Sequence, residues 1–143
     1  MLAGLLALTA AAAFSGAAVY VWAVEHVARE ALDDRAQLVE WKPSYKRGAL
    51  MQASLSPLGA IAGAWAWHQT GDMLFLAGAL FLIAPWPWTL LVIKPINDRL
   101  LQAPPEQAGA ETRALLKSWG HLHAVRMMLG VAAALLYLAA LAG

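Results

Sequence analysis

Residues 73–93 read MLFLAGALFLIAPWPWTLLVI and contain no charged side chain. A helix needs about 20 mostly apolar residues to cross roughly 30 Å of hydrocarbon, and this stretch has that length. Its apolar residues follow one another without the alternation that marks a β-strand of a membrane barrel. The stretch therefore predicts a helix that crosses a membrane.

Three other stretches also lack charge, namely Met1–Val24, Gly48–Trp67 and Met127–Gly143. The last is the shortest, but Ala114–Trp119 reads as helix and extends it. Because 61% of the chain is hydrophobic, a soluble fold is excluded. We predict an all-α protein in which residues 1–143 form one integral membrane four-helix bundle, with helices over about 2–24, 48–67, 73–93 and 114–141.

The first stretch could also be taken for a signal peptide. It lacks a basic n-region, however, and its apolar run exceeds the usual ~7–15 residues, so we expect a retained helix. The chain has no cysteine, which excludes disulfides, thiolate metal sites and dithiol chemistry. Its net charge of +1 and the absence of a basic patch argue against a nucleic-acid partner.

The basic residues predict the orientation of the bundle. All Lys and Arg fall in the loops 25–47 and 94–118, except Arg126 just inside the last helix, and none falls in His68–Asp72. The positive-inside rule then places both loops in the cytoplasm and both termini on the extracytoplasmic side. We expect the protein in a lipid bilayer, in the setting of a bacterial inner membrane.

Prolines and glycines predict where helices stop and touch. We expect the first helix to run past the membrane and to be followed by a break at Lys42-Pro43, and we expect Ala103-Pro104-Pro105 in the loop 94–118 to stop any helix. Thr112 is a plausible cap for the fourth. Gly59-x-x-x-Gly63 has the spacing at which helices approach closely, either within the chain or across a homo-oligomer seam.

Three polar or aromatic residues form a stripe at the inner end of the last helix. Trp119, His123 and Arg126 stand at i, i+4 and i+7, whereas His121 points elsewhere. An arginine at this depth is costly unless it reaches the headgroups or faces a partner inside the bundle, and both remain open.

The third helix is expected to face this stripe. Pro85 and Pro87 each remove a helical hydrogen bond and so free the carbonyls of Phe81 and Ile83. In lipid such carbonyls need a partner or a cavity, which predicts a kink at the depth of the stripe. The tryptophans around the kink are either part of a site or ordinary residues of the headgroup belt. The side chains beside it are Trp86, Trp88 and Thr89.

Two further groups could contribute. The third helix is expected to end at Lys94-Pro95, where Asn97 either caps the end or cross-links it to another helix. A metal centre built from Glu25, His26 and His121 is an alternative, but the spacing offers no ordinary pair of imidazole ligands. We therefore expect no metal.

These residues carry a resemblance to a known family. The patterns are Thr89-x-x-x-x-Lys94-Pro95-Ile96-Asn97-x-x-Leu100, Leu116-x-x-Trp119-x-x-x-His123-x-x-Arg126, and Phe14-Ser-Gly16 followed by Tyr20. They resemble the anthrone oxygenase-like family of small four-helix membrane proteins. The chain departs from that family at Glu25-His26, where a proline often ends the first helix.

The resemblance implies oxidation of an activated methylene in a hydrophobic aromatic substrate, of anthrone or quinol type, by dioxygen and without a cofactor. Such a reaction needs a base and a group that binds the enolate oxygen, and we expect His123 as the base, with Arg126 and Asn97 stabilising the oxyanion. We expect four residues to bind the substrate: Trp119, Trp88, Thr89 and Trp86. The alternative is a non-catalytic membrane protein that binds a lipid or other hydrophobic small molecule or assists a partner complex, and a transporter comes third.

Overall fold

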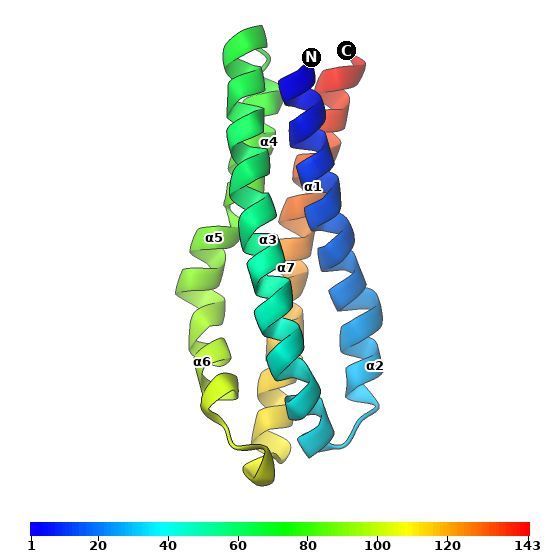
Figure 1. The fold of residues 1–143 in the computed structure, drawn as a ribbon, viewed down its shortest axis with the longest axis vertical. Coiled ribbons are helices and arrows are strands. Elements are labelled where there is room, and N and C mark those ends of the chain that lie inside the picture. The colour runs from blue at the N-terminus through cyan, green and yellow to red at the C-terminus, as the bar shows by residue number, and fades with distance from the viewer.

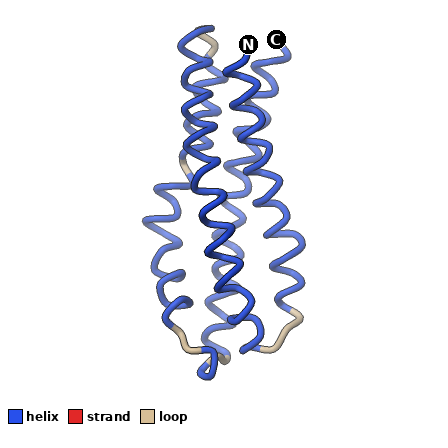
Figure 2. The backbone as a smooth tube through the Cα atoms, viewed as in Figure 1, coloured by secondary structure: helices blue, strands red, loops and turns tan.

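The computed structural model describes residues 1–143 as four long helical rods that run up and down beside one another (Figure 1). Figure 2 shows that the chain is helix joined by turns, without a strand, which confirms the all-α class. The helical elements are α1 (Leu2–Tyr20), η1 (Val21–Glu25), α2 (His26–Glu30), α3 (Asp34–Thr70), α4 (Met73–Ile83), α5 (Pro85–Trp88), η2 (Thr89–Ile93), α6 (Lys94–Gln102), η3 (Pro105–Gln107) and α7 (Ala110–Ala142).

Three of the four rods are long and apolar enough to cross a membrane: Leu2–Glu30, Met73–Gln102 and Ala110–Ala142. Helix α3 is not among them, because its first half is charged and its apolar half contains polar residues such as Gln52 and Ser56. The expected four helices are therefore present, and the fourth membrane crossing stays a prediction.

The half of the bundle that holds the termini is tightly packed. Here α1 and α4 each pack against both α3 and α7. The Tyr137 ring lies against Gly63 and Gly78, where any Cβ would collide with it. Gly59 likewise faces Ala10 of α1, so the Gly59-x-x-x-Gly63 motif is used for contacts within the chain. A homo-oligomer stays a prediction.

The expected break at Lys42-Pro43 is wrong, because α3 begins at Asp34 and continues through Pro43. Its start is set by Asp33, whose carboxylate accepts a hydrogen bond from the Ala36 amide at 2.8 Å. Proline removes only one helical hydrogen bond, and the helix tolerates the loss here. As a result α3 carries its residues before Gly48 into the bundle instead of leaving them in a loop.

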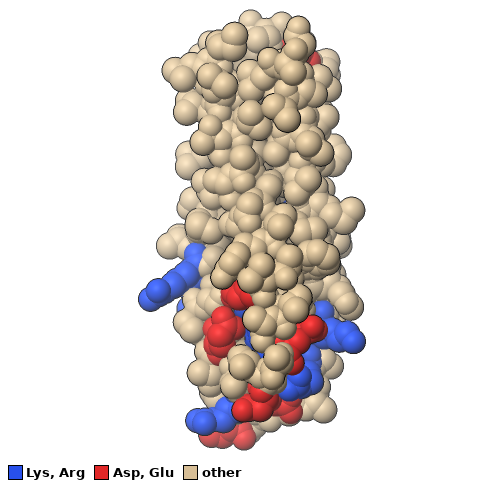
Figure 3. Space-filling view, turned by 90° about the vertical axis from the view of Figure 1, so that its right-hand side faces the viewer, with Lys and Arg blue, Asp and Glu red and all other residues tan.

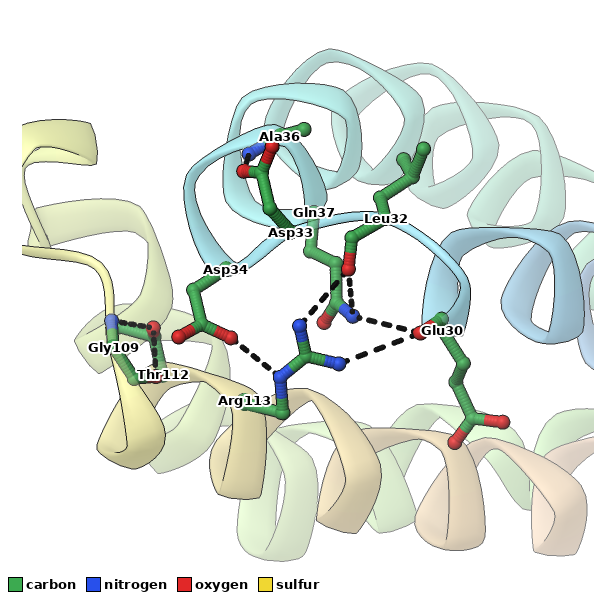
Figure 4. Close-up of polar contacts among 9 residues, drawn as sticks. All are labelled: Glu30, Leu32, Asp33, Asp34, Ala36, Gln37, Gly109, Thr112 and Arg113. Carbon is green, nitrogen blue, oxygen red and sulfur yellow. Dashed lines mark hydrogen bonds and ion pairs between the residues drawn. The ribbon is translucent and has the colours of Figure 1, made fainter.

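Arg113 of α7 holds the turn between α2 and α3 (Figure 4). Its guanidinium donates to the carbonyl of Leu32 at 2.9 Å and to that of Glu30 at 3.4 Å, and it pairs with Asp34. Gln37 donates to the same two carbonyls. The last carbonyls of a helix otherwise lack partners, so these contacts fix how the first two rods meet the fourth.

Figure 4 also shows the start of α7. The N-cap is Gly109, and the Thr112 hydroxyl accepts from its amide at 3.0 Å and donates to its carbonyl at 2.9 Å. Thr112 therefore caps the helix, as predicted, but from a position inside its first turn.

The third rod bends where the prolines predict a kink. Helix α4 ends at Ile83, α5 begins at Pro85, and from there the rod leans away from the other three (Figure 1). The hydroxyl of Ser56 donates to the Leu82 carbonyl at 2.6 Å, which gives a carbonyl at the bend a partner from α3. The bend separates the tightly packed half from a more open half.

The expected helix end at Lys94-Pro95 is wrong, because the rod continues as α6 to Gln102. The reason lies in η2, a π-helical turn that ends at Ile93, directly before α6. Pro95 then occupies the first turn of α6, where a missing amide hydrogen does little harm. The predicted stop at Ala103-Pro104-Pro105 is confirmed.

The charged residues gather at the end of the molecule opposite the termini. On the face drawn in Figure 3, Lys, Arg, Asp and Glu crowd this end, and the rest of the face is uncharged except for acidic atoms at the far end. This division matches the loops 25–47 and 94–118, and the open half of the bundle lies next to the charged end.

Candidate active site

The predicted stripe on α7 faces the interior. Trp119, His123 and Arg126 are all buried, whereas His121 is exposed. The prediction from helical spacing, that these three residues share one face and His121 does not, is therefore confirmed.

Aromatic rings pack around the stripe. The rings of Trp119 and His123 stack with centroids 5.1 Å apart, and Trp41 of α3 meets Trp119 edge-on at 5.8 Å. Tyr45, one turn further along α3, stacks on Trp41 at 4.7 Å with an interplanar angle of 10°. Trp119 is only 5% exposed, so it orients His123 and offers little open surface to a ligand.

The contacts of His123 define which of its ring nitrogens is a base. Nε2 lies 3.1 Å from the carbonyl oxygen of Ala18, on α1. A carbonyl only accepts, so Nε2 carries the hydrogen and donates it. Nδ1 is then the unprotonated nitrogen, and it is buried without a partner in the protein. His123 is thus held in the tautomer that leaves Nδ1 free to take a proton.

Arg126 is a buried cation without an acidic partner. It is 8% exposed, and its Nη2 donates to the Gln52 side-chain oxygen at 3.0 Å. Its Nε is buried without any hydrogen bond, and no carboxylate lies within ion-pair distance. A lone buried charge is costly, so the site favours an anion beside Arg126. An arginine that reaches the lipid headgroups would be exposed, and this one is not.

Arg29 shows the opposite arrangement close by. Its guanidinium pairs with Glu25 at 2.6 Å and also with Glu40. Ser44 donates to the same Glu25 carboxylate, and Arg29 lies over the Trp119 ring at 5.9 Å. Glu25 and Arg29 stand at i, i+4 on one rod, and with Glu40 they form a cluster of one cation and two carboxylates. Arg29 is thus paired within the protein, whereas Arg126 has no carboxylate partner.

Asn97 cross-links two helices. Its Nδ2 donates to the phenolic oxygen of Tyr45 at 3.0 Å, which joins α6 to α3. Asn97 is buried in the interior of α6, so it does not cap a helix end. Burial raises the pKa of the Tyr45 phenol, and the nearby Arg126 cation opposes that shift. The phenol is therefore neutral at physiological pH.

Two cavities meet at Arg126. The smaller, about 20 Å³, has room for a water molecule and is faced by His123 and Trp119. The larger, about 190 Å³, lies between α3 and the segment α5–η2. It opens on the side of the helix bundle beside the exposed residues Trp86 and Leu90. Four residues line both: Tyr45, Ala49, Gln52 and Arg126.

The residues at the kink have separate positions. Trp86 and Thr89 line the larger cavity, and the Thr89 hydroxyl is buried without a partner. Trp86 donates its indole hydrogen to the Ala53 carbonyl at 3.3 Å. Trp88 lines neither cavity and donates to the Leu122 carbonyl at 3.1 Å, which ties α5 to α7. A role of Trp88 in substrate binding stays a prediction.

A π-helical turn borders each cavity. Val21 and Glu25 of η1 line the smaller cavity, and Thr89 and Leu90 of η2 line the larger. Such turns insert one residue into a helix and re-aim the side chains that follow, and they recur at functional sites. Both are placed where the bundle opens.

The structure does not assemble the alternative metal centre. No group of three or more His, Cys, Asp or Glu side chains is arranged to hold a metal ion. Glu25 is engaged by Arg29 and Ser44, His26 faces Glu30 at 3.7 Å, and His121 is exposed.

The sequence interpretation missed Tyr45 and Gln52. Tyr45 falls in the segment expected to be a loop after a break at Pro43, so its place on α3 was not foreseen. Gln52 did leave a signal, because a glutamine inside an apolar helix needs a polar partner. That partner is Arg126.

Comparison with known proteins agrees with this geometry. The family model described as Anthrone oxygenase matches residues 41–136, from Trp41 on α3 to Leu136 on α7. That range is well over half of the chain and includes every residue common to the two cavities. No curated protein and no solved structure matches the chain. The match to the family model shows that the chain belongs to the anthrone oxygenase family.

Proposed function

We propose that the protein is a membrane-embedded oxygenase that oxidises the activated methylene of an anthrone-type substrate with dioxygen. The observation that carries the proposal is the uncompensated Arg126 beside an apolar cavity. A buried cation that lacks an acid in the protein is suited to an anion that forms on a bound substrate.

The reaction needs a base and an anion-binding group. Removal of one methylene proton from an anthrone gives an aromatic enolate whose negative charge lies largely on oxygen. This enolate reacts with dioxygen to form a carbon–oxygen bond and, after protonation, a hydroperoxide. Loss of the second methylene proton and cleavage of the O–O bond release water and leave a quinone carbonyl. The methylene is oxidised by four electrons, and one dioxygen accepts them.

Residues at the meeting point of the cavities, together with His123 on the smaller cavity, fit these tasks. Nδ1 of His123 accepts the methylene proton, either directly or through a water in the smaller cavity. Arg126 binds the enolate oxygen, and Gln52 holds the guanidinium in place. The base and the cation lie one helical turn apart on the same face of α7.

The larger cavity supports a flat hydrophobic substrate that arrives from the lipid. An apolar cavity of roughly 150 Å³ in another protein binds benzene, so about 190 Å³ has room for one or two fused rings. Further rings would extend between Trp86 and Leu90 into the hydrocarbon. A substrate of this kind partitions into the bilayer and needs no route through water.

The alternative, a non-catalytic protein that binds a lipid, uses Arg126 as a headgroup anchor. That role requires an exposed guanidinium at the membrane surface. The burial of Arg126 against Gln52 favours the oxygenase.

The proposal predicts that the reconstituted protein converts anthrone to anthraquinone with the uptake of one dioxygen per product. Ala49→Phe fills the space common to both cavities and is expected to lower turnover at least tenfold. The matched control is Ala12→Phe, on an exposed position of α1. Oxygen uptake and quinone absorbance measure the reaction. A wild-type protein without turnover, or an Ala49→Phe variant as active as Ala12→Phe, would refute the proposal.

We further propose that α3 also crosses the membrane, that the charged end is cytoplasmic and that both termini are extracytoplasmic in a bacterial inner membrane. The distribution of Lys and Arg supports this orientation. Because the chain has no cysteine, single introduced thiols report it directly. Gln69→Cys is expected to react with an impermeant maleimide in intact cells, and Gln107→Cys only after permeabilisation. The reverse pattern, or equal labelling of both, would contradict this topology.

A further inference from the structure

We propose that Tyr45 is a second donor to the substrate oxygen, and that Asn97 acts by positioning it. The inference rests on the proposed function, because it concerns the oxyanion formed in that reaction. It adds a catalytic residue from α3 to those on α7. Asn97 then acts on the substrate only through Tyr45.

The first observation is the direction of the Asn97 contact. Nδ2 of Asn97 donates to the Tyr45 phenolic oxygen, so that oxygen already accepts a hydrogen bond. The phenol still has its own hydrogen to donate, and it makes no hydrogen bond to an acceptor in the protein. A half-buried phenol normally uses that hydrogen. Here it is left for a group that enters the site.

The second observation is the location of Tyr45. It lines both cavities, as do Gln52 and Arg126. Arg126 lies close enough to Tyr45 for its charge to act on the phenol. A substrate oxygen at the junction of the cavities therefore meets a cation from α7 and a neutral O–H from α3. Two donors from different helices define one position for the oxyanion.

The third observation is that the Tyr45 ring is held from two sides. Trp41 stacks on it at 4.7 Å, and Asn97 holds the phenolic oxygen from α6. Because burial raises the pKa of this phenol, it keeps its hydrogen at neutral pH even beside Arg126. A fixed, neutral donor stabilises charge without having to reorganise during the reaction.

Asn97 itself lines neither cavity. It is buried on α6 and has no polar hydrogen bond to the site except through Tyr45. We therefore assign it as a positioning residue, in contrast to the direct contact with the oxyanion that we expected from the sequence.

The test uses the full-length protein in lipid nanodiscs with anthrone under nitrogen. Without dioxygen the reaction stops at the enolate, whose absorbance differs from that of anthrone. Tyr45→Phe removes only the O–H and is expected to lower the fraction of bound anthrone present as enolate by about 10- to 100-fold. Tyr20→Phe makes the same chemical change at an exposed tyrosine and serves as the control.

A double-mutant cycle separates positioning from direct contact. If Asn97 acts through Tyr45, Asn97→Ala lowers the enolate fraction, and adding it to Tyr45→Phe lowers the fraction no further. If Asn97 touches the oxyanion itself, the two losses multiply. Multiplied losses would therefore overturn the positioning role.

The outcomes distinguish this inference from the proposed function. Enolate that forms equally in Tyr45→Phe and in Tyr20→Phe overturns the role of Tyr45 and leaves the oxygenase intact. Enolate that forms under nitrogen without giving quinone in air overturns the oxygenase, while a loss in Tyr45→Phe still supports the oxyanion site. A wild-type protein that forms no enolate overturns both.

Discussion

Arg126→Met is expected to lower kcat/KM for anthrone by about 10³-fold. Methionine keeps an unbranched apolar stem like that of arginine but lacks the guanidinium, so the change removes the one cation that faces the junction of the cavities. Loss of a single donor to an oxyanion costs about 10²- to 10³-fold in other enzymes, and a buried guanidinium should lie at the upper end. The initial rate of quinone formation at several anthrone concentrations measures it.

The same substitution separates a functional charge from a structural one. Arg126 has no acidic partner, so its burial destabilises the fold, and the midpoint of thermal unfolding should not fall in Arg126→Met. The exposed Arg47→Met is the control and should leave both activity and stability unchanged. A less stable Arg126→Met that retained turnover would show that the guanidinium serves the fold.

His123→Ala is expected to lower kcat by about 10²- to 10⁴-fold, the usual contribution of a positioned base. We expect Nδ1 to accept the proton, because the Ala18 carbonyl holds the hydrogen on Nε2. Added imidazole should restore part of the activity, since truncation of the ring opens space beside the smaller cavity. The measurement is anthrone turnover with and without imidazole.

Two further variants serve as controls for His123→Ala. His121→Ala removes an exposed imidazole two residues away and should have no effect on turnover. His123→Gln can still donate to the Ala18 carbonyl but has no basic nitrogen, so it should be as slow as His123→Ala. Full activity in His123→Gln would mean that the residue only cross-links α7 to α1, and another base would have to be sought.

The helices were predictable because a long apolar run can form few structures other than a helix. The kink near Ala84 was predictable because the two prolines lack amide hydrogens. The stripe of Trp119, His123 and Arg126 was predictable because helical spacing alone places its members on one face. These features depend on local sequence.

What could not be predicted depends on how a proline is accommodated. Pro43 and Pro95 both suggested ends of helices, yet Pro43 is absorbed within α3 and Pro95 follows a π-helical turn. No local pattern reveals such a turn. A break at Pro43 places Tyr45 in a loop, and its contact with Asn97, 52 positions further along the chain, has no signal in the sequence.

The break at Ala84 places the reacting groups and the mouth of the cavity on different parts of the chain. The base, the cation and the phenol come from α7 and α3, whereas Trp86, Thr89 and Leu90 at the mouth follow the break. Under the proposed function, substitutions in this one short segment would alter which ring systems are admitted and would leave the proposed oxidation step unchanged. Substrate selectivity and the proposed chemistry would then be adjustable independently of each other.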